Sequence, residues 1–381
     1  MGWQSCPIYS QKRKHIFMIK VLIINSVPTE KNGITNVIFN FLSKMDTTGI
    51  QLDLLSINAP ENMYRDIVEQ KGGHLFILER SGRKIFQYLR ALKRLIKTGK
   101  YDIVHVHGNS HTLVLELMAA KLAGCRVRIA HAHNTTCNNV LLHKILTPCF
   151  NVLCTNGLAC GADAGKWMFG EKPFKVLNNG VDIMTYAFNK QLRDEYRKQF
   201  GFGKTVVIGH VGTFIPVKNQ TFIIDIFNKL VTRNESLRLM LIGEGPLMED
   251  VKEKVDGYGL TDKVVFTGGV HNVNELLNAI DIIVMPSLYE GLPLSLIEQQ
   301  VNGLPCIVAD TITREADKTG NLKFLSLKAP IEDWAEAIMH EDGASREARS
   351  KKAIEDITKA GYNIKEQAKK LVSFYREAIV K

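Results

Sequence analysis

Short apolar runs alternate with amphipathic segments along almost the whole of this 381-residue chain. In the first half, apolar runs such as 19–24 and 103–106 are separated by segments of helical period such as 85–96. The second half repeats the alternation, with apolar runs at 206–211 and 282–285. Runs this short are typical of parallel strands that are buried on both faces and joined by helices. The pattern therefore predicts an α/β fold with doubly wound parallel sheets.

The length is too great for one ordinary hydrophobic core and favours two domains. We predict two Rossmann-like domains, with a boundary in the charged segment 182–203, which lacks a strand pattern. The predicted ranges are a leader at 1–17, a first domain at 18–190, a second at 191–358, and a C-terminal helix at 359–381 that packs back on the first domain. The leader is polar and basic and lacks the apolar segment of a secretory signal, so we expect it to be disordered, with a native start near Met18.

The formal charge of +10 is concentrated in the first half of the chain. Residues 1–190 contain 24 Lys and Arg against 12 Asp and Glu, whereas residues 191–381 contain 25 against 27. This asymmetry predicts that the first domain faces an anionic surface or ligand. We find no signature of a nucleic-acid recognition module, so we expect no nucleic-acid partner and favour an anionic membrane surface.

The seven cysteines form no Cys-x-x-Cys pair and match no zinc or disulfide framework. Reduced thiols in a cytoplasmic protein are therefore expected. No apolar run reaches the roughly 18 residues that a membrane-spanning helix requires. A peripheral position on the inner face of the cell membrane is compatible with these features.

The segment from Ser287 to Glu298 is the most informative local motif. Gly291 supplies a flexible turn after the apolar run 282–285, and Pro293 suits the first position of a helix. The unpaired N–H groups of that helix would face an anion at the strand's C-terminal edge, and a diphosphate matches such a site. Glu290 and Glu298 flank the site, where carboxylates can accept hydrogen bonds from a sugar and a ribose. Two solvated glutamates are the alternative, which the Glu-Gly-Leu-Pro core makes less favoured.

Lys218 lies in the turn after the apolar run 206–211, just ahead of a segment of helical period. A cation at that position could neutralise a diphosphate leaving group, which is usually the largest contribution to group transfer. A solvated loop lysine explains the motif equally well when Lys218 is considered alone.

Several segments together resemble the retaining GT-B glycosyltransferases of family 4, above all the bacterial capsular and exopolysaccharide enzymes. The resemblance spans nearly the whole chain from Met18, and the segment 286–294 with Glu298 is its most specific part. The other matching segments are Asn32-Gly33, 130–135, 176–181, Val211-Gly212 with Lys218-Asn219, 241–246 and 304–311. The resemblance implies a GT-B fold, with an acceptor-binding first domain and a donor-binding second domain that face a cleft.

The resemblance also implies roles for individual residues. Glu290 would bind the hydroxyls of the donor sugar and Glu298 the ribose, while Lys218 would hold the diphosphate. His133 matches the histidine that leans over the reacting sugar, so His133, Lys218 and Glu290 are the predicted catalytic residues. The further predicted donor-binding residues are Gly33, Gly212, Thr213, Val270, Gly291, Leu292, Pro293 and Leu294. Among these, Gly33 would let the backbone approach the phosphate, and Val270 belongs to the loop that meets the base.

Two positions depart from the family pattern. Thr213 stands where the family usually has an arginine, which acts as the second cation on the diphosphate. The first loop has the single glycine Gly33 where many relatives have a pair. The first departure makes nucleotide-sugar binding a firmer prediction than turnover.

Two pairs of histidines, His105 with His107 and His131 with His133, alternate near the ends of two predicted strands. Such pairs can bind metal, but we expect His105, His107 and His131 to be hydrogen-bonded within the protein. GT-B enzymes need no metal and the chain contains no Asp-x-Asp motif, so we predict metal-independent transfer without a cofactor. No covalent nucleophile stands out, which favours a front-face path with retention.

Segment 83–97 combines an apolar stripe, formed by Ile85, Leu89, Leu92 and Ile96, with basic residues elsewhere. We expect the stripe to pack on the sheet, while the basic face could touch an anionic leaflet that holds a lipid-linked saccharide acceptor.

Three other functions remain open at this point. The Gly243-Glu-Gly245 turn partly imitates a dinucleotide-binding turn of an oxidoreductase, but the third glycine and the ribose-binding acid are missing. A GT-B nucleotide-sugar epimerase would share the nucleotide site. A degenerate, non-catalytic homologue that binds a nucleotide-sugar is the third, because of Thr213. The preference for a UDP-sugar rests on resemblance alone.

Overall fold

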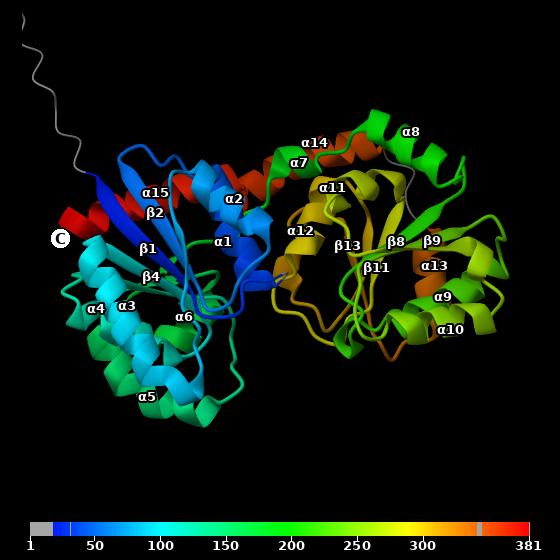
Figure 1. The fold of residues 1–381 in the computed structure, drawn as a ribbon. Helices are drawn as coiled ribbons and strands as arrows, with labels where there is room; N and C mark the ends of the chain where they lie inside the picture. The colour runs from blue at the N-terminus through cyan, green and yellow to red at the C-terminus, as the bar shows by residue number, and fades with distance from the viewer. Residues whose placement is uncertain (1–17, 31, 341–344, 381) are drawn as a thin grey trace, which may run out of the picture. The chain divides into compact units, whose positions relative to one another are not determined.

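The computed structural model describes residues 18–30, 32–340 and 345–380, so the predicted leader lies outside the described residues. The chain forms two compact units, each built on a parallel sheet (Figure 1). Unit 1 comprises the chain up to Leu177 and the chain from Lys369 onward, and unit 2 comprises Asn178–Ala368. The predicted α/β class with two Rossmann-like domains is confirmed.

Unit 1 contains a seven-stranded sheet in the order β3-β2-β1-β4-β5-β6-β7, whose strand pairs are parallel. Its strands are β1 Ile19–Asn25, β2 Ile50–Ser56, β3 Leu75–Ile77, β4 Ile103–Gly108, β5 Val127–Ala132, β6 Asn156–Ala159 and β7 Lys175–Val176. Its helices are α1 Gly33–Lys44, α2 Asn62–Gln70, α3 Ile85–Gly99, α4 Val114–Leu122, α5 Val140–Leu153 and α6 Ala162–Phe169.

The side chains of β4 and β5 alternate between two environments, as the period of a strand requires. Val104, Val106, Ala130 and Ala132 join the apolar core beneath α3, α4, α5 and α6. The intervening histidines therefore lie on the opposite face of the sheet. On that face His105 contacts Tyr375 from the end of helix α15 (Ile364–Val380). The central strands thus carry an apolar face and a histidine face.

Unit 2 contains a six-stranded sheet in the order β10-β9-β8-β11-β12-β13, again with parallel pairs. Its strands are β8 Val207–Val211, β9 Arg238–Ile242, β10 Val264–Gly268, β11 Ile282–Met285, β12 Cys306–Ala309 and β13 Leu322–Leu325. Its helices are α7 Ile183–Tyr186, α8 Lys190–Gln199, α9 Gln220–Val231, α10 Met248–Gly257, α11 Val273–Leu276, α12 Leu294–Val301, α13 Ile331–Met339 and α14 Arg346–Lys359. The central strands β8 and β11 are adjacent, so the segments that follow them share one edge of the sheet.

The contact boundary at 177/178 lies before the predicted segment 182–203, which is not an extended linker but contains α7 and α8. Arg193 and Arg197 of α8 both form ion pairs with Asp281, at the start of β11. These bonds attach α8 to unit 2. Sequence patterning could not show this attachment, because the partners lie far apart along the chain.

Helix α15 begins in unit 2, and from Lys369 on it packs in unit 1. The predicted stripe is largely correct, because Ala368, Leu371, Val372 and Tyr375 are buried, although Ile379 is only partly buried. The Tyr375 hydroxyl lies 2.7 Å from His105 Nδ1. Arg376 donates a hydrogen bond to the carbonyl of Thr48 in unit 1.

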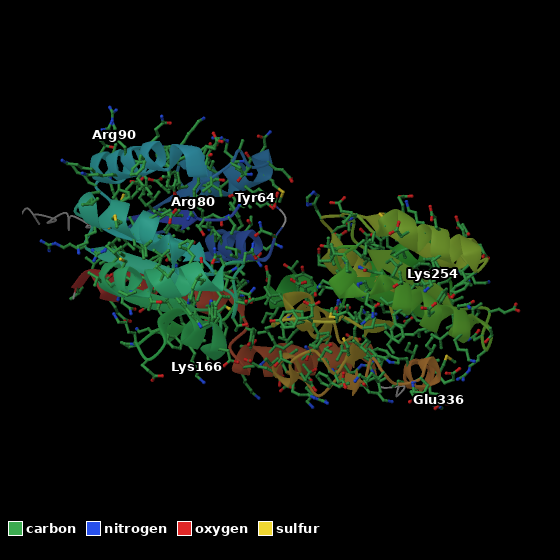
Figure 2. The ribbon with its side chains drawn as sticks, turned by 90° about the horizontal axis from the view of Figure 1, so that it is seen from below. Tyr64, Arg80, Arg90, Lys166, Lys254 and Glu336 are labelled. Atoms are coloured by element: carbon green, nitrogen blue, oxygen red, sulfur yellow. The ribbon has the colours of Figure 1, made fainter. Side chains whose placement is uncertain are left out.

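The apolar stripe of α3 packs as expected. Leu92 and Ile96 are buried in the core of unit 1, and Ile85 and Leu89 are partly buried against it. The basic residues of α3 are exposed, and Arg90 projects outward from this helix (Figure 2). Among the described residues, no helix has the length and apolar character required to span a membrane.

Candidate active site

The loops that follow β8 and β11 are held together at the carboxyl edge of the unit 2 sheet. The backbone N–H of Leu288 donates to the carbonyl of Val217, and the Asn219 amide donates to the carbonyl of Pro286. Asn219 adopts the left-handed conformation with φ of 56°, which asparagine tolerates better than most residues. This kink ends the 3-10 turn Pro216–Lys218 and starts α9. The position of Lys218 is therefore fixed on both sides.

Lys218 and Glu290 meet at this edge, as an ion pair with 2.5 Å between Nζ and Oε1. Both side chains are largely buried, with 18% and 13% of their surface exposed. The sequence predicted both residues for one site but did not predict that they would contact each other. The pair places one cation and one carboxylate side by side at a strand edge, where a diphosphate and a hydroxylated sugar could each find a partner.

Helix α12 begins one residue later than predicted. Pro293 is its N-cap and Leu294 its first residue, so the first N–H groups of α12 lie directly after Gly291 and Leu292. Glu298 lies in the second turn, as predicted. The helix start, Lys218 and Glu290 therefore belong to one short stretch of the sheet edge, and the helix dipole adds positive potential there.

Glu298 is partly buried, and burial raises the pKa of its carboxyl group to about 7. The hydroxyl of Tyr186, in helix α7, donates a hydrogen bond to this carboxylate and partly offsets that rise in pKa. The backbone of Tyr186 is itself held, because the Asn302 amide donates to its carbonyl at 2.9 Å. Sequence reasoning missed Tyr186, since no local pattern connects it to Glu298.

The raised pKa of Glu298 makes stability depend on pH. The folded protein holds this proton more tightly than the unfolded chain, whose glutamate pKa is near 4.5. The contribution of Glu298 to the unfolding free energy therefore falls as pH rises from about 4.5 to about 7 and stays constant above. Glutamine does not titrate, so Glu298→Gln does not lose this contribution as the pH rises. The melting temperature of the variant minus that of wild type should therefore be larger at pH 8 than at pH 5. Thermal denaturation at both pH values tests this. The exposed Glu347→Gln should instead follow wild type, and an equal gain in both variants would contradict the expectation.

Glycines let neighbouring loops approach the site closely. A Cβ on Gly212 would lie 3.1 Å from His210 Nε2 and 3.4 Å from Lys218 Cδ. Gly243 has a φ of +140°, and its Cβ would lie 2.1 Å from the Gly212 carbonyl oxygen. The glycines that suggested a dinucleotide turn therefore serve backbone packing between the loops after β8 and β9.

His210 is buried, which lowers its pKa to about 4, and its Nδ1 lies 2.9 Å from the carbonyl oxygen of Val284.

The remaining predicted residues of unit 2 lie around this edge. Thr213 is exposed, and its carbonyl accepts a hydrogen bond from the Gln220 amide at 2.9 Å. Val270 follows β10 and packs partly buried on the apolar cluster under the sheet. The Gly243 N–H donates to the Gly268 carbonyl, which ties the loop after β10 to the loop after β9.

In unit 1, Gly33 is the first residue of α1 and is exposed, with nothing within 4 Å of a Cβ built there. Asn32 caps the helix by accepting a hydrogen bond from the Thr35 N–H. The absence of a side chain at Gly33 is therefore not required by packing inside the protein. It leaves space at the start of α1, and the phosphate contact of Gly33 stays a prediction.

His133 is the first residue after β5, and its Nε2 lies 2.8 Å from Nδ1 of His107 on β4. Burial lowers the pKa of His133 to about 3, so its ring is neutral at physiological pH. The expectation that His105, His107 and His131 are hydrogen-bonded within the protein is wrong in part. Both ring nitrogens of His131 and Nε2 of His105 are buried without a hydrogen-bond partner. The rings instead stack on one another, which sequence alternation alone does not predict.

Three of these histidines could be considered as metal ligands. One ring nitrogen from each of His105, His107 and His131 lies within 4.8 Å of the others. However, the rings of His105 and His131 are parallel to within 11°. Stacked rings direct their in-plane lone pairs side by side rather than toward one ion, so metal ligation would require ring rotation. Metal-independent transfer stays a prediction.

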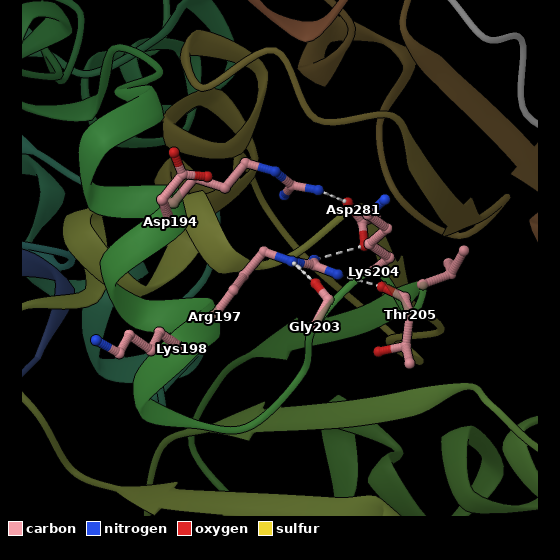
Figure 3. Close-up of a pocket in the computed structure, with 9 residues that line it drawn as sticks. Asp194, Arg197, Lys198, Gly203, Lys204, Thr205 and Asp281 are labelled. Carbon is pink, nitrogen blue, oxygen red and sulfur yellow. Dashed lines mark hydrogen bonds and ion pairs between the residues drawn. The ribbon is translucent and has the colours of Figure 1, made fainter.

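A separate cavity of about 610 Å³ lies at the amino end of β8 and β11, opposite the candidate site (Figure 3). Its Arg197 donates to the carbonyl of Gly203 and to Asp281, which also pairs with Arg193. The Val207 N–H donates to the same carboxylate. One carboxylate thus contacts two guanidinium groups and a backbone N–H, in an ion-pair network that attaches α8 to unit 2.

Comparison with known proteins agrees with this geometry. Residues 31–184 match the family model described as Glycosyltransferase Family 4, and residues 205–340 match the model described as Glycosyl transferases group 1. The protein named "Putative glycosyltransferase EpsF" of Bacillus subtilis strain 168 is 33% identical over 364 residues, which cover 91% of this chain and 93% of EpsF. The UDP-Gal:alpha-D-GlcNAc-diphosphoundecaprenol alpha-1,3-galactosyltransferase of Escherichia coli is 32% identical over 243 residues, covering 60% of this chain and 62% of that enzyme.

Among solved structures, Anabaena HepE in complex with UDP aligns with a TM-score of 0.78 at 15% identity, covering 94% of this chain and all of that one. The glycosyltransferase WaaG, involved in lipopolysaccharide biosynthesis, aligns with a TM-score of 0.63 at 14% identity, over 92% of this chain and 98% of that chain. These likenesses bear on the fold, whereas the EpsF match extends to sequence over nearly the full length. The chain therefore belongs to the GT-B glycosyltransferases of the group 1 and family 4 type.

Proposed function

We propose that this protein transfers a sugar from a UDP-sugar to a lipid-linked saccharide acceptor, with retention of anomeric configuration, in capsule or exopolysaccharide synthesis. The observation that carries the proposal is the Lys218–Glu290 pair beside the start of α12. Lys218 and the first N–H groups of α12 would bind the diphosphate, and Glu290 would accept hydrogen bonds from the sugar. Glu298 would bind the ribose, and His133 of unit 1 would assist at the reacting sugar.

In this proposal the chain's own residues stabilise the charge that develops during transfer. As the sugar–phosphate bond breaks, the negative charge that develops on the diphosphate is stabilised by Lys218 and the helix dipole. The departing phosphate oxygen accepts the proton of the acceptor hydroxyl, which attacks from the same face and so retains the configuration. Detection of a covalent glycosyl-enzyme by mass spectrometry would contradict this path.

Two kinds of relative support the choice of substrates. HepE has been crystallised with UDP and with UDP-glucose, and the Escherichia coli relative is named for a UDP-galactose donor and a diphosphoundecaprenol-linked acceptor. A thermal-shift screen of nucleotide-sugars tests donor binding. A true donor should raise the melting temperature of wild type and lose most of that effect on Glu298→Ala, because stabilisation follows ligand affinity. Equal shifts in both proteins would exclude Glu298 from the donor site.

The exposed Thr213 favours one competing function, a homologue that binds a nucleotide-sugar without turnover. A nucleotide-sugar epimerase is the other competitor. Release of free nucleoside diphosphate that requires added lipid-linked acceptor would support transfer. Conversion of the nucleotide-sugar into an epimer, without net release of nucleoside diphosphate, would favour the epimerase, and binding with neither release nor conversion would favour the non-catalytic homologue.

Unit 1 carries an exposed surface suited to an anionic membrane, which would present the acceptor. Helices α3, α4 and α5 lie side by side over the same core (Figure 1). On α5, Leu141 and Ile145 are 70% and 63% exposed, and Phe86 on α3 is 85% exposed. Exposed lysines accompany them, including Lys93 and Lys144. Apolar side chains among basic ones are typical of a helix surface that lies at an anionic interface.

Leu141→Glu combined with Ile145→Glu should therefore abolish sedimentation with anionic vesicles at low salt, while the melting temperature stays near that of wild type. The two new carboxylates remove apolar contact area and repel the anionic lipid. Met339→Glu, an exposed apolar residue of unit 2, is the matched control and should sediment as wild type does. Unchanged sedimentation of the α5 variant would exclude this surface.

A further inference from the structure

We propose that His107 is a positioning residue that holds the ring of His133 in its working orientation. The proposal rests on the role of His133 in the proposed function. It adds a second histidine, fixed in the sheet, that acts on the reaction only through the first. The observation that supports it most directly is the 2.8 Å contact between His107 Nδ1 and His133 Nε2.

His133 needs such support because of its place in the chain. The strand β5 ends at Ala132, so His133 lies just beyond the parallel ladder that fixes its neighbours. The ring of His133 is partly buried, and its Nδ1 is buried without a hydrogen-bond partner. A histidine with one ring nitrogen hydrogen-bonded to a fixed neighbour has a defined ring orientation.

His107 can provide that support because it lies on a rigid strand. It pairs in register with Asn25 of β1 on one side and with His131 of β5 on the other, and only 3% of its surface is exposed. The rings of His107 and His133 are inclined by only 16°, with 5.0 Å between centroids, as an edge-to-edge hydrogen bond between the two nitrogens requires. The hydrogen bond therefore transmits the rigidity of two central strands to a residue outside the ladder.

The hydrogen bond to His107 also decides which ring nitrogen of His133 remains without a protein partner. Burial lowers the pKa of both histidines far enough to keep them neutral at physiological pH, so the contact contains one proton. If His107 Nδ1 holds that proton, His133 must carry its own proton on Nδ1 and becomes a donor there. If His133 Nε2 holds it, His133 Nδ1 becomes an acceptor. In either case Nδ1 of His133, which is buried in this structure, is the ring nitrogen that the contact with His107 leaves without a protein partner.

The test compares His107→Phe with His107→Asn. Phenylalanine fills the site and keeps an aromatic ring but cannot bond to His133, whereas the amide of asparagine can occupy the place of Nδ1. His107→Phe should lower kcat about 10- to 100-fold without changing the thermal shift that UDP produces, because misplacement of a catalytic group affects the transition state. His107→Asn should recover a large part of kcat. Tyr375→Phe is the control, because it removes a hydrogen bond from the same cluster but none to His133.

Three outcomes would overturn the proposal. One is a His107→Phe enzyme with wild-type kcat, and another is a His107→Asn enzyme no better than His107→Phe. The third concerns the double variant with His133→Ala, in which the effect of His107→Phe on kcat should disappear. If the two effects are instead additive, His107 does not act through His133. If His107→Phe does not fold, ring ¹⁵N NMR of the wild type decides, because the His133 Nε2 shift must report a hydrogen bond. Full activity of His133→Ala would instead refute the role of His133 in the proposed function.

Discussion

Lys218→Ala is expected to lower kcat/KM for sugar transfer by about 10²- to 10³-fold, the cost typical of removing one preorganised group that stabilises charge in a transition state. Lys218 lies 2.5 Å from Glu290 and is only 18% exposed, so its charge acts where water screens it weakly. The family resemblance predicts an arginine where this chain has Thr213, so we expect the stabilisation of the diphosphate charge to depend mainly on Lys218. The variant also leaves Glu290 without its ion-pair partner. Initial rates of acceptor-dependent UDP release measure the effect.

Lys229→Ala is the matched control for this experiment. Lys229 belongs to the same unit and also forms an ion pair, with 2.8 Å between its Nζ and Oε1 of Glu332, but both side chains are more than 40% exposed. Its replacement should leave kcat/KM within about threefold of wild type, because exposed ion pairs contribute little. A Lys218→Ala enzyme that matched this control would exclude Lys218 from the reaction.

Asp281→Asn is expected to lower the free energy of unfolding by about 3 kcal/mol or more, the usual cost of breaking a partly buried ion-pair network. One carboxylate there serves Arg193, Arg197 and the backbone N–H of Val207. Arg197 is only 8% exposed, so it would retain a charge that water reaches poorly. Urea denaturation of the full chain gives the change in the unfolding transition of unit 2.

The surface pair Lys229–Glu332 again supplies the comparison. Glu332→Gln removes a carboxylate at a similar distance from its partner, but in an exposed setting, and should leave the unfolding transition close to that of wild type. If both variants lost the same free energy of unfolding, the ion-pair network at the amino end of β8 and β11 would contribute no more to stability than an exposed ion pair does.

Much of the fold was predictable from local pattern. The alternation of apolar runs with helical segments depends on which residues each element must bury, and it correctly indicated two parallel α/β sheets. The start of α12 was predicted to within one residue, because Gly291 and Pro293 are strong local signals. The boundary between the units was less accessible. Residues just after the boundary are held in unit 2 by hydrogen bonds from Asn178 to Gly361 and from Val181 to Tyr362, and no local pattern reports a contact between residues so far apart along the chain.

The candidate site divides in the same way. Residue type and spacing made Glu290, Glu298 and Lys218 candidates, because carboxylates, a helix start and a cation near strand ends suit a nucleotide-sugar, and their roles stay predictions. Tertiary structure alone determined that Lys218 contacts Glu290, that Tyr186 bonds to Glu298, and that His107 contacts His133. The physical reason is that strand and helix periodicity records which face a side chain occupies, whereas pairing between side chains depends on the order of strands in the sheet. That order places β8 beside β11 and β4 beside β5, and it is decided by packing across the whole unit.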